Sequence, residues 1–105
     1  MGKATNIIKK LRIFKENVKI EFPVIKLILF GSRATCNQHK YSDIDLIVVS
    51  PKFKKLNYFK RGAKMYNYWD LDYPVDFLCF TPEEFNAKKK QVSIVSEALK
   101  KGIEI

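Results

Sequence analysis

Two aspartates stand two positions apart at the head of an apolar run, in the segment DIDLIVVS that begins at Asp43. If this run is a β-strand, Asp43 and Asp45 face the same side of the sheet, because side chains alternate between its faces. Neighbouring carboxylates repel each other unless a cation lies between them. Mg²⁺ prefers carboxylate oxygens and keeps waters and phosphates as its other ligands. The spacing therefore predicts a Mg²⁺ site at these two residues.

A third carboxylate, Asp76, interrupts the otherwise apolar run VDFLCF. A carboxylate on a buried strand needs a compensating partner. If strand 75–80 lies beside strand 43–50, Asp76 can face the same site as the aspartate pair. Three converging carboxylates can hold two metal ions and activate a hydroxyl group for in-line attack on a phosphate. The third carboxylate would be the candidate general base.

Gly31 and Ser32 follow an apolar run directly and precede a polar segment. A glycine lets the backbone approach a ligand closely, and a serine hydroxyl beside backbone N–H groups favours phosphate oxygens. Arg33 could add positive charge. A Gly-Ser pair after a strand is usually a turn, and an isolated Asp-x-Asp often begins a surface strand. The prediction of a phosphate-handling site therefore depends on the combination.

Several other reactive residues are expected to have no chemical role. Asp70 and Asp72 form a second Asp-x-Asp, which we interpret as exposed loop carboxylates. His39 lies in the polar loop and is predicted to be exposed rather than in contact with a phosphate. Cys36 and Cys79 belong to no Cys-x-x-Cys motif, so two reduced thiols are expected rather than a metal site or a disulfide.

Periodicity predicts the elements that must position these residues. A helix is expected over residues 5–21, capped by Thr5 or Asn6 and ended at Phe22-Pro23. Its apolar face comprises Ile7, Leu11, Phe14 and Val18. Short apolar runs predict buried strands over 25–30, 43–50 and 75–80.

Three further helices complete the predicted pattern. One is expected over residues 53–69, with apolar positions Leu56, Phe59, Ala63 and Tyr66. The next begins at Thr81, with Pro82 in the first helical position and Glu84 closing a capping box. The last covers 92–101, ends at Gly102, and buries Val92, Val95 and Leu99 or a neighbouring face. The order of elements predicts an α/β (α+β) fold, a small sheet covered by helices.

Composition narrows the class of protein. The 105 residues suit a single domain spanning 1–105, and 47% hydrophobic residues are enough for a core. No apolar run approaches the roughly 20 residues of a membrane span, and the N-terminus lacks a signal-peptide core, so a cytoplasmic protein is expected. The net charge of +9 favours polyanionic partners such as nucleic acid, nucleoside triphosphates or an acidic protein. A generally lysine-rich proteome explains the same charge.

The segment LILFGSRATCNQHKYSDIDLIVVS resembles a family signature. An apolar strand, Gly-Ser, a ten-residue loop (33–42) and Asp-x-Asp in a second apolar strand are similar to the DNA polymerase beta-like nucleotidyltransferase superfamily. TPEEF and the closing helix resemble its minimal nucleotidyltransferase (MNT) proteins. The similarity extends from about Leu11 to Ile105. One departure is Cys36, since relatives often have glycine at this position. The difference bears on the geometry of the loop and not on the carboxylates.

The resemblance implies a nucleotidyltransferase fold with a mixed sheet, and transfer of a nucleoside monophosphate, often AMP from ATP, to a hydroxyl acceptor. It implies that Asp43 and Asp45 bind two Mg²⁺ ions and that Asp76 completes one metal site and deprotonates the acceptor. Gly31 and Ser32 would hold the triphosphate. Small members are often encoded beside a HEPN-domain protein, as antitoxins of a toxin–antitoxin pair, so a HEPN-type partner is expected.

Two alternatives remain open. The chain could neutralise its partner by covering it, with an interface drawn from exposed aromatic residues. The candidates are Tyr58, Tyr66, Tyr68 and Trp69, and a core role for half of them is equally expected. The net charge also allows a nucleic-acid binder, although no RNP, helix-turn-helix or zinc pattern supports one. Self-association is compatible with every alternative.

Overall fold

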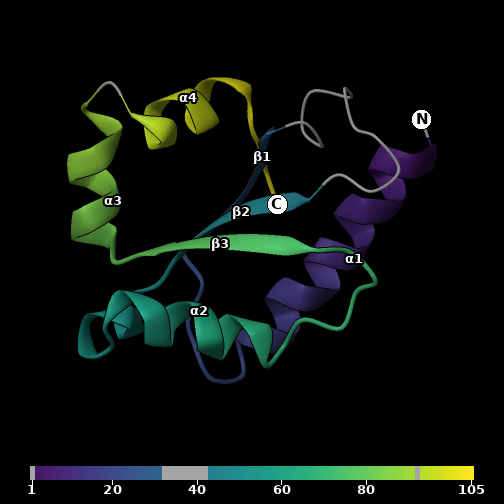
Figure 1. Cartoon of the computed structure of the whole chain (residues 1–105), viewed down its shortest axis with the longest axis horizontal. Helices are drawn as coiled ribbons and strands as arrows, with labels where there is room; N and C mark the ends of the chain where they lie inside the picture. Colours follow the sequence, from purple (N-terminus) through teal and green to yellow (C-terminus); the bar gives the residue numbers. More distant parts are fainter. Residues whose placement is uncertain (1, 32–42, 92) are drawn as a thin grey trace.

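A mixed four-stranded sheet with helices on both faces forms the molecule (Figure 1). The computed structural model describes residues 2–31, 43–91 and 93–105. The elements are α1 (Gly2–Val18), β1 (Lys26–Phe30), β2 (Ile44–Val49), the 3-10 helix η2 (Pro51–Lys55), α2 (Tyr58–Tyr66), β3 (Val75–Phe80), α3 (Pro82–Lys89), α4 (Ile94–Lys101) and β4 (Ile103–Glu104). The predicted α/β (α+β) fold with a small mixed sheet flanked by helices is confirmed.

The strand order is β3-β2-β1-β4. β2 runs parallel to β3, while β1 is antiparallel to both β2 and β4. All three predicted strands form within one or two residues of their expected bounds. β4 is an addition that the sequence did not indicate, because two residues are too few to show a period.

The two faces of the sheet carry separate cores. On one face α1 buries the four residues predicted for its apolar side, Ile7, Leu11, Phe14 and Val18. On the other face α3 and α4 bury Phe85, Val95 and Ala98 against alternate residues of the strands. Alternation along β2 therefore decides which side chains face α1 and which face α4.

The start of α1 was predicted incorrectly. Thr5 and Asn6, the expected caps, lie inside a helix that begins at Gly2. The helix ends at Val18 and is followed by a turn before Pro23. The first turn of a helix without a strong cap is hard to locate from sequence, because its residues face solvent and follow no apolar period.

The predicted helix over 53–69 is wrong in both extent and buried face. Ser50 caps η2, and Asn57 starts α2 separately, because its side chain accepts the backbone N–H of Lys60. Of the expected apolar face, Phe59 is 86% exposed, and α2 instead buries Arg61 and Met65. The other expected positions lie outside α2 or remain exposed: Leu56, Ala63 and Tyr66.

Helices α3 and α4, which pack in the second core, confirm most of the start and end signals predicted for them. Thr81 caps α3 with the predicted capping box to Glu84, and Pro82 is the first helical residue. In α4 the buried residues are Val95 and Ala98, whereas Leu99 is 41% exposed. This is the neighbouring face that the sequence left open. Val92 lies outside the described residues.

Gly102 ends α4 as predicted, but for a different reason. Its φ of −82° is accessible to any residue. A Cβ there would overlap the Ala98 carbonyl oxygen and stand 2.9 Å from both Ile28 Cγ2 and the Leu29 carbonyl oxygen. The glycine therefore lets the chain leave α4 and pair at once with β1 as β4.

Candidate active site

Asp45 and Asp76 lie side by side on the parallel strands β2 and β3, as partners in the register of the sheet. The condition placed on Asp76 from sequence, that its strand lies beside the Asp45 strand, is met. Both residues occupy positions that alternate with the α1 core, so they face the α4 side of the sheet. Asp43 directly precedes β2 and is exposed.

The three carboxylates interact electrostatically. Burial raises the pKa of the Asp45 carboxyl, and the charges of Asp76 and Asp43 raise it further. Each cause disfavours the ionised form, and among the described residues none is found that offsets them, so a cation near Asp45 would favour its ionised form. This is the electrostatic condition that a Mg²⁺ site requires.

The described side chains would supply only some of the ligands of a metal ion. Within the described residues, no three His, Cys, Asp or Glu side chains gather closely enough to hold a metal ion by themselves. Asp45 and Asp76 form an adjacent pair, and Asp43 acts on the pair through its charge. Two or three carboxylate oxygens suit Mg²⁺, which takes its remaining ligands from water and substrate phosphates.

Gly31 brings the backbone against the carboxylate of Asp45. It follows β1 at the point where Phe30 pairs with Asp45, and its φ is +79°, in the left-handed region. A Cβ on Gly31 would overlap Oδ2 of Asp45. Both conditions require glycine at this position. Ser32 and Arg33, predicted to bind phosphate, and Cys36 and His39 lie outside the described residues.

Asp45 borders two cavities. One of about 420 Å³ lies toward α4 and is lined by Gly31, Glu97 and Lys101 among others. The other, of about 480 Å³, lies toward α2 and includes Asp76, Tyr58 and Tyr66. Both cavities are mostly apolar and share Phe30 and Ile94 as lining residues. The first adds the charges of Glu97 and Lys101, whereas the second adds Asp76 and the two tyrosines.

A third cavity of about 550 Å³ extends the second one along the sheet. The two share Tyr58, Leu78 and Ile94 as lining residues, so they adjoin. The lining of this larger cavity also includes Phe80, Val95 and Lys88. The aromatic side of the site therefore offers room for a group well beyond the size of a single hydroxyl.

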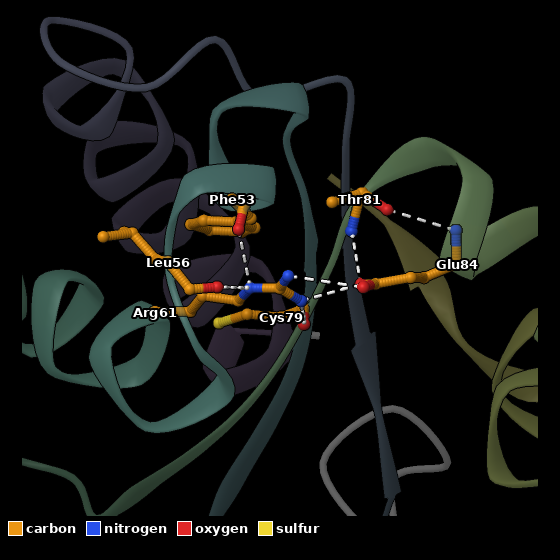
Figure 2. A network of polar contacts seen from close by, with 6 residues as sticks. All are labelled: Phe53, Leu56, Arg61, Cys79, Thr81 and Glu84. Atoms are coloured by element: carbon orange, nitrogen blue, oxygen red, sulfur yellow. Dashed lines mark hydrogen bonds and ion pairs between the residues drawn. The ribbon is translucent and has the colours of Figure 1, made fainter.

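The position of α2, which forms one wall of these spaces, depends on Arg61 (Figure 2). Its Nε donates to the carbonyl oxygens of Phe53 and Leu56, at 2.9 and 3.0 Å. Its Nη1 donates to the Cys79 carbonyl oxygen at 3.2 Å and to Glu84 Oε1 at 2.7 Å. One side chain thereby joins η2, α2, β3 and the start of α3.

Glu84 completes this network. It accepts from Nη1 and Nη2 of Arg61 and from the Thr81 backbone N–H, at 2.9 Å for the latter. The Arg61 hydrogen bond is the main cause that lowers the pKa of the Glu84 carboxyl. The role of Glu84 in a capping box could be predicted from sequence, whereas Arg61 could not, because an arginine within an apparently apolar helix has no periodic signal.

The structure also describes several residues that the sequence placed outside the chemical site. Asp70 and Asp72 are exposed outside helices and strands. Cys79 is a buried free thiol, and burial raises its pKa to about 12, so it is an unreactive core residue. Tyr58 and Tyr66 are about half exposed, whereas Tyr68 and Trp69 pack against the α1 core.

No helix in the described part of the chain combines the length and apolarity needed to cross a bilayer.

Comparison with known proteins gives one family match and one solved structure of interest. The family model described as "Nucleotidyltransferase domain" matches residues 7–104. The fold is similar to a crystal structure of a candidate nucleotidyltransferase from Sulfolobus solfataricus, with a TM-score of 0.68 and 23% sequence identity. That likeness covers 99% of this chain and 89% of the other. No match was found among curated proteins.

Proposed function

The chain belongs to the nucleotidyltransferase domain family, and from that premise we propose that it transfers a nucleoside monophosphate to a hydroxyl group in a Mg²⁺-dependent reaction. The observation that carries the proposal is the register pairing of Asp45 with Asp76 beside Gly31. The raised pKa of the Asp45 carboxyl supports a cation-binding role.

Each carboxylate has a distinct part in this proposal. Asp43 and Asp45 would hold Mg²⁺, which when bound supplies positive charge to the phosphates, and Asp76 would complete one of two metal positions. Asp76 is also exposed toward the cavity on the α2 side, where it can accept a proton from an acceptor hydroxyl.

The two cavities bordered by Asp45 suggest how the substrates are arranged. We assign the triphosphate to the cavity with Gly31, where Ser32 and Arg33 continue the chain, and the acceptor to the cavity with Asp76. The acceptor oxygen loses its proton to Asp76 and forms a bond to the α-phosphorus. The bond from that phosphorus to the bridging oxygen breaks, and pyrophosphate leaves.

ATP as donor and AMP as the transferred group form the more specific part of the proposal, together with a role as antitoxin toward a HEPN-type protein. These follow from the resemblance of the Gly-Ser and Asp-x-Asp segments to the nucleotidyltransferase superfamily, and of TPEEF and the closing helix to its minimal members. The apolar lining near Asp76 is compatible with a protein side chain as acceptor.

A second candidate function is neutralisation of a partner by masking. The observation that favours it is the exposed aromatic surface of α2, where Phe59 is 86%, Tyr66 53% and Tyr58 46% exposed. Aromatic residues are enriched in protein interfaces. This surface borders the site, so binding and transfer would involve the same side of the molecule.

Titration of ATP with Mg²⁺, followed by incubation with labelled nucleoside triphosphates and the protein encoded next door, tests the proposal. We expect binding by the wild type and a mass increase of one nucleotide on the neighbour. Asp45→Asn and Asp76→Asn should abolish transfer, whereas Asp70→Asn and Asp72→Asn, the exposed pair with the same spacing, should retain it. Absence of ATP binding under varied metals would contradict the proposal.

The same variants separate transfer from masking. If Asp43→Asn and Asp76→Asn still neutralise the partner, the masking function is favoured. If neutralisation disappears with transfer while the variants still bind the partner, chemistry is responsible.

A further inference from the structure

The cavity on the Gly31 side of Asp45 contains a charged pair on α4. Ile94, Glu97, Ala98 and Lys101 all line this cavity. Their spacing of three, four and seven residues places them on one helical face. Lys101 Nζ lies 3.9 Å from Glu97 Oε2, and both side chains are more than half exposed. Such an exposed pair is weak, so the lysine is free to take another partner.

Charge in the two cavities is unevenly distributed. Among the described residues, Lys101 is the one cation lining either cavity that Asp45 borders. The Gly31 cavity otherwise carries the carboxylates of Asp45 and Glu97, and the other cavity carries Asp45 and Asp76. A triphosphate entering beside two carboxylates needs positive charge on its distal phosphates as well as at the metal.

We propose that Lys101 binds the β- and γ-phosphates of the nucleoside triphosphate, leaving Glu97 when the nucleotide enters. This inference rests on the proposed function. Glu97 lies beside the lysine in the free protein and repels phosphate, so its charge opposes binding. The ammonium group of Lys101 suits this role, because it is a compact charge on a flexible stem that can follow the phosphates.

The helix offers a matched control. Lys100 is the adjacent residue, carries the same charge and is exposed, but it lines neither cavity. Lys100→Ala and Lys101→Ala change the net charge equally and alter the same last turn of α4. A difference between them in nucleotide affinity therefore reports the local position of Lys101 and not the general attraction of a basic protein for phosphate.

The test is calorimetric titration of the full chain, with Mg²⁺, using AMP, ADP and a non-hydrolysable ATP analogue. We expect Lys101→Ala to weaken binding of the ATP analogue about tenfold, the loss of one charged hydrogen bond, and Lys100→Ala to change it less than about twofold. Glu97→Gln should tighten it about two- to threefold by removing repulsion. The Lys101→Ala effect should vanish with AMP, which has no β- or γ-phosphate.

The outcomes are distinguishable. Equal affinities of Lys101→Ala and Lys100→Ala for the ATP analogue, with tight binding by the wild type, overturn the role of Lys101 and leave the proposed function intact. An equal loss of ADP, AMP and ATP-analogue affinity in Lys101→Ala also overturns it, since it would indicate a merely structural effect. A wild type that binds none of the nucleotides overturns the proposed function and this inference together.

Discussion

At the residue scale, the charge of Asp45 reduces stability, although the proposed function needs that charge. Its pKa is raised by burial and by the charges of Asp76 and Asp43, so ionisation destabilises the folded state. Because the folded pKa is the higher one, this contribution favours folding at low pH and is lost as the pH rises through it. A carboxyl group whose pKa is shifted by burial and by neighbouring charges is typical of a functional site.

We therefore expect Asp45→Asn to abolish transfer while leaving the free energy of unfolding unchanged or raised, by at most about 1 kcal/mol after solvent screening. Urea denaturation at neutral pH in the presence of EDTA measures this. The gain should shrink in acid, where the wild-type carboxyl is protonated as well. A loss of stability above about 2 kcal/mol would instead identify Asp45 as a structural residue.

Gly31 provides a second prediction at this scale. Gly31→Ala places a side chain at φ +79° and against Asp45 Oδ2. We expect a loss of about 1–2 kcal/mol in stability and of most transfer activity. Gly62→Ala is the control, because a Cβ there meets nothing within 4 Å and lies inside α2. It should stabilise the protein by about 0.5–1 kcal/mol. Because Gly62 also lines the cavity that contains Asp76, it is a control for stability only. Thermal denaturation compares the two variants, and the transfer assay is applied to Gly31→Ala.

The Asp-x-Asp spacing and the β-strand period predict from sequence that Asp43 and Asp45 share one face, and the structure places Asp45 beside Asp76 on that face. The position of Asp76 beside Asp45 could be predicted only with the order of the strands, which residue spacing alone does not provide. Nothing in the sequence pointed to Lys101 as a site residue. Its relation to Gly31 depends on how α4 crosses β1, and lysines at the ends of helices are common for electrostatic reasons.

At the element scale, the Arg61 network decides where α2 lies. Arg61→Met removes hydrogen bonds to three backbone carbonyl oxygens and to the Glu84 carboxylate, and we expect a loss of about 3 kcal/mol in stability. Lys60→Met, at the exposed neighbouring position, should change stability by no more than about 0.5 kcal/mol. Chemical denaturation compares them. Equal stability of the two variants would show that α2 is held by its apolar contacts alone.

The acid range tests the same network through Glu84. Its pKa is lowered in the folded state, chiefly by Arg61, from an ordinary value of 4.5. Its contribution to stability is therefore complete above that value and is lost as the pH falls through the folded pKa. We expect the wild type to lose stability below about pH 4.5, and Glu84→Gln to lack that part of the pH dependence. Parallel pH profiles of the two proteins would contradict this.

The elements that sequence analysis predicted incorrectly have physical explanations. Aromatic residues at helical spacing over 53–69 suggested a buried face, yet the cap at Asn57 starts α2 afresh and rotates Phe59 into solvent. The stem of Arg61 fills part of the face that an apolar residue would normally occupy, because all three guanidinium nitrogens donate hydrogen bonds. Capping boxes, by contrast, are local, and the one at Thr81 was predicted correctly.

At the scale of the whole molecule, the net charge of +9 should increase the affinity for any polyphosphate. We expect binding of the ATP analogue to weaken as NaCl rises from low to physiological concentration, because exposed charges are screened beyond about 8–10 Å. Adenosine, which carries no phosphate, is the control and should show little salt dependence. An ATP-analogue affinity that is independent of salt would mean that only groups in direct contact matter.

Tyr66 and Arg61 of α2 also contact the outer edge of β3. β3 is an edge strand of the described sheet, and its even-numbered residues pair with β2, as the bond from Ile44 N–H to the Pro74 carbonyl oxygen shows. The outward carbonyl groups are thus those of odd-numbered residues. Two of them, on Val75 and Cys79, accept hydrogen bonds from Tyr66 and Arg61 of α2.

An open strand edge is a template on which other chains add and aggregate. α2 occupies part of that template with side-chain donors, so the helix that borders the site also protects the sheet from intermolecular pairing. The exposed aromatic residues of α2 can therefore be presented to a partner without leaving a bare β-edge beside them. The nine-residue helix α2 thus combines an exposed aromatic surface with protection of the strand edge.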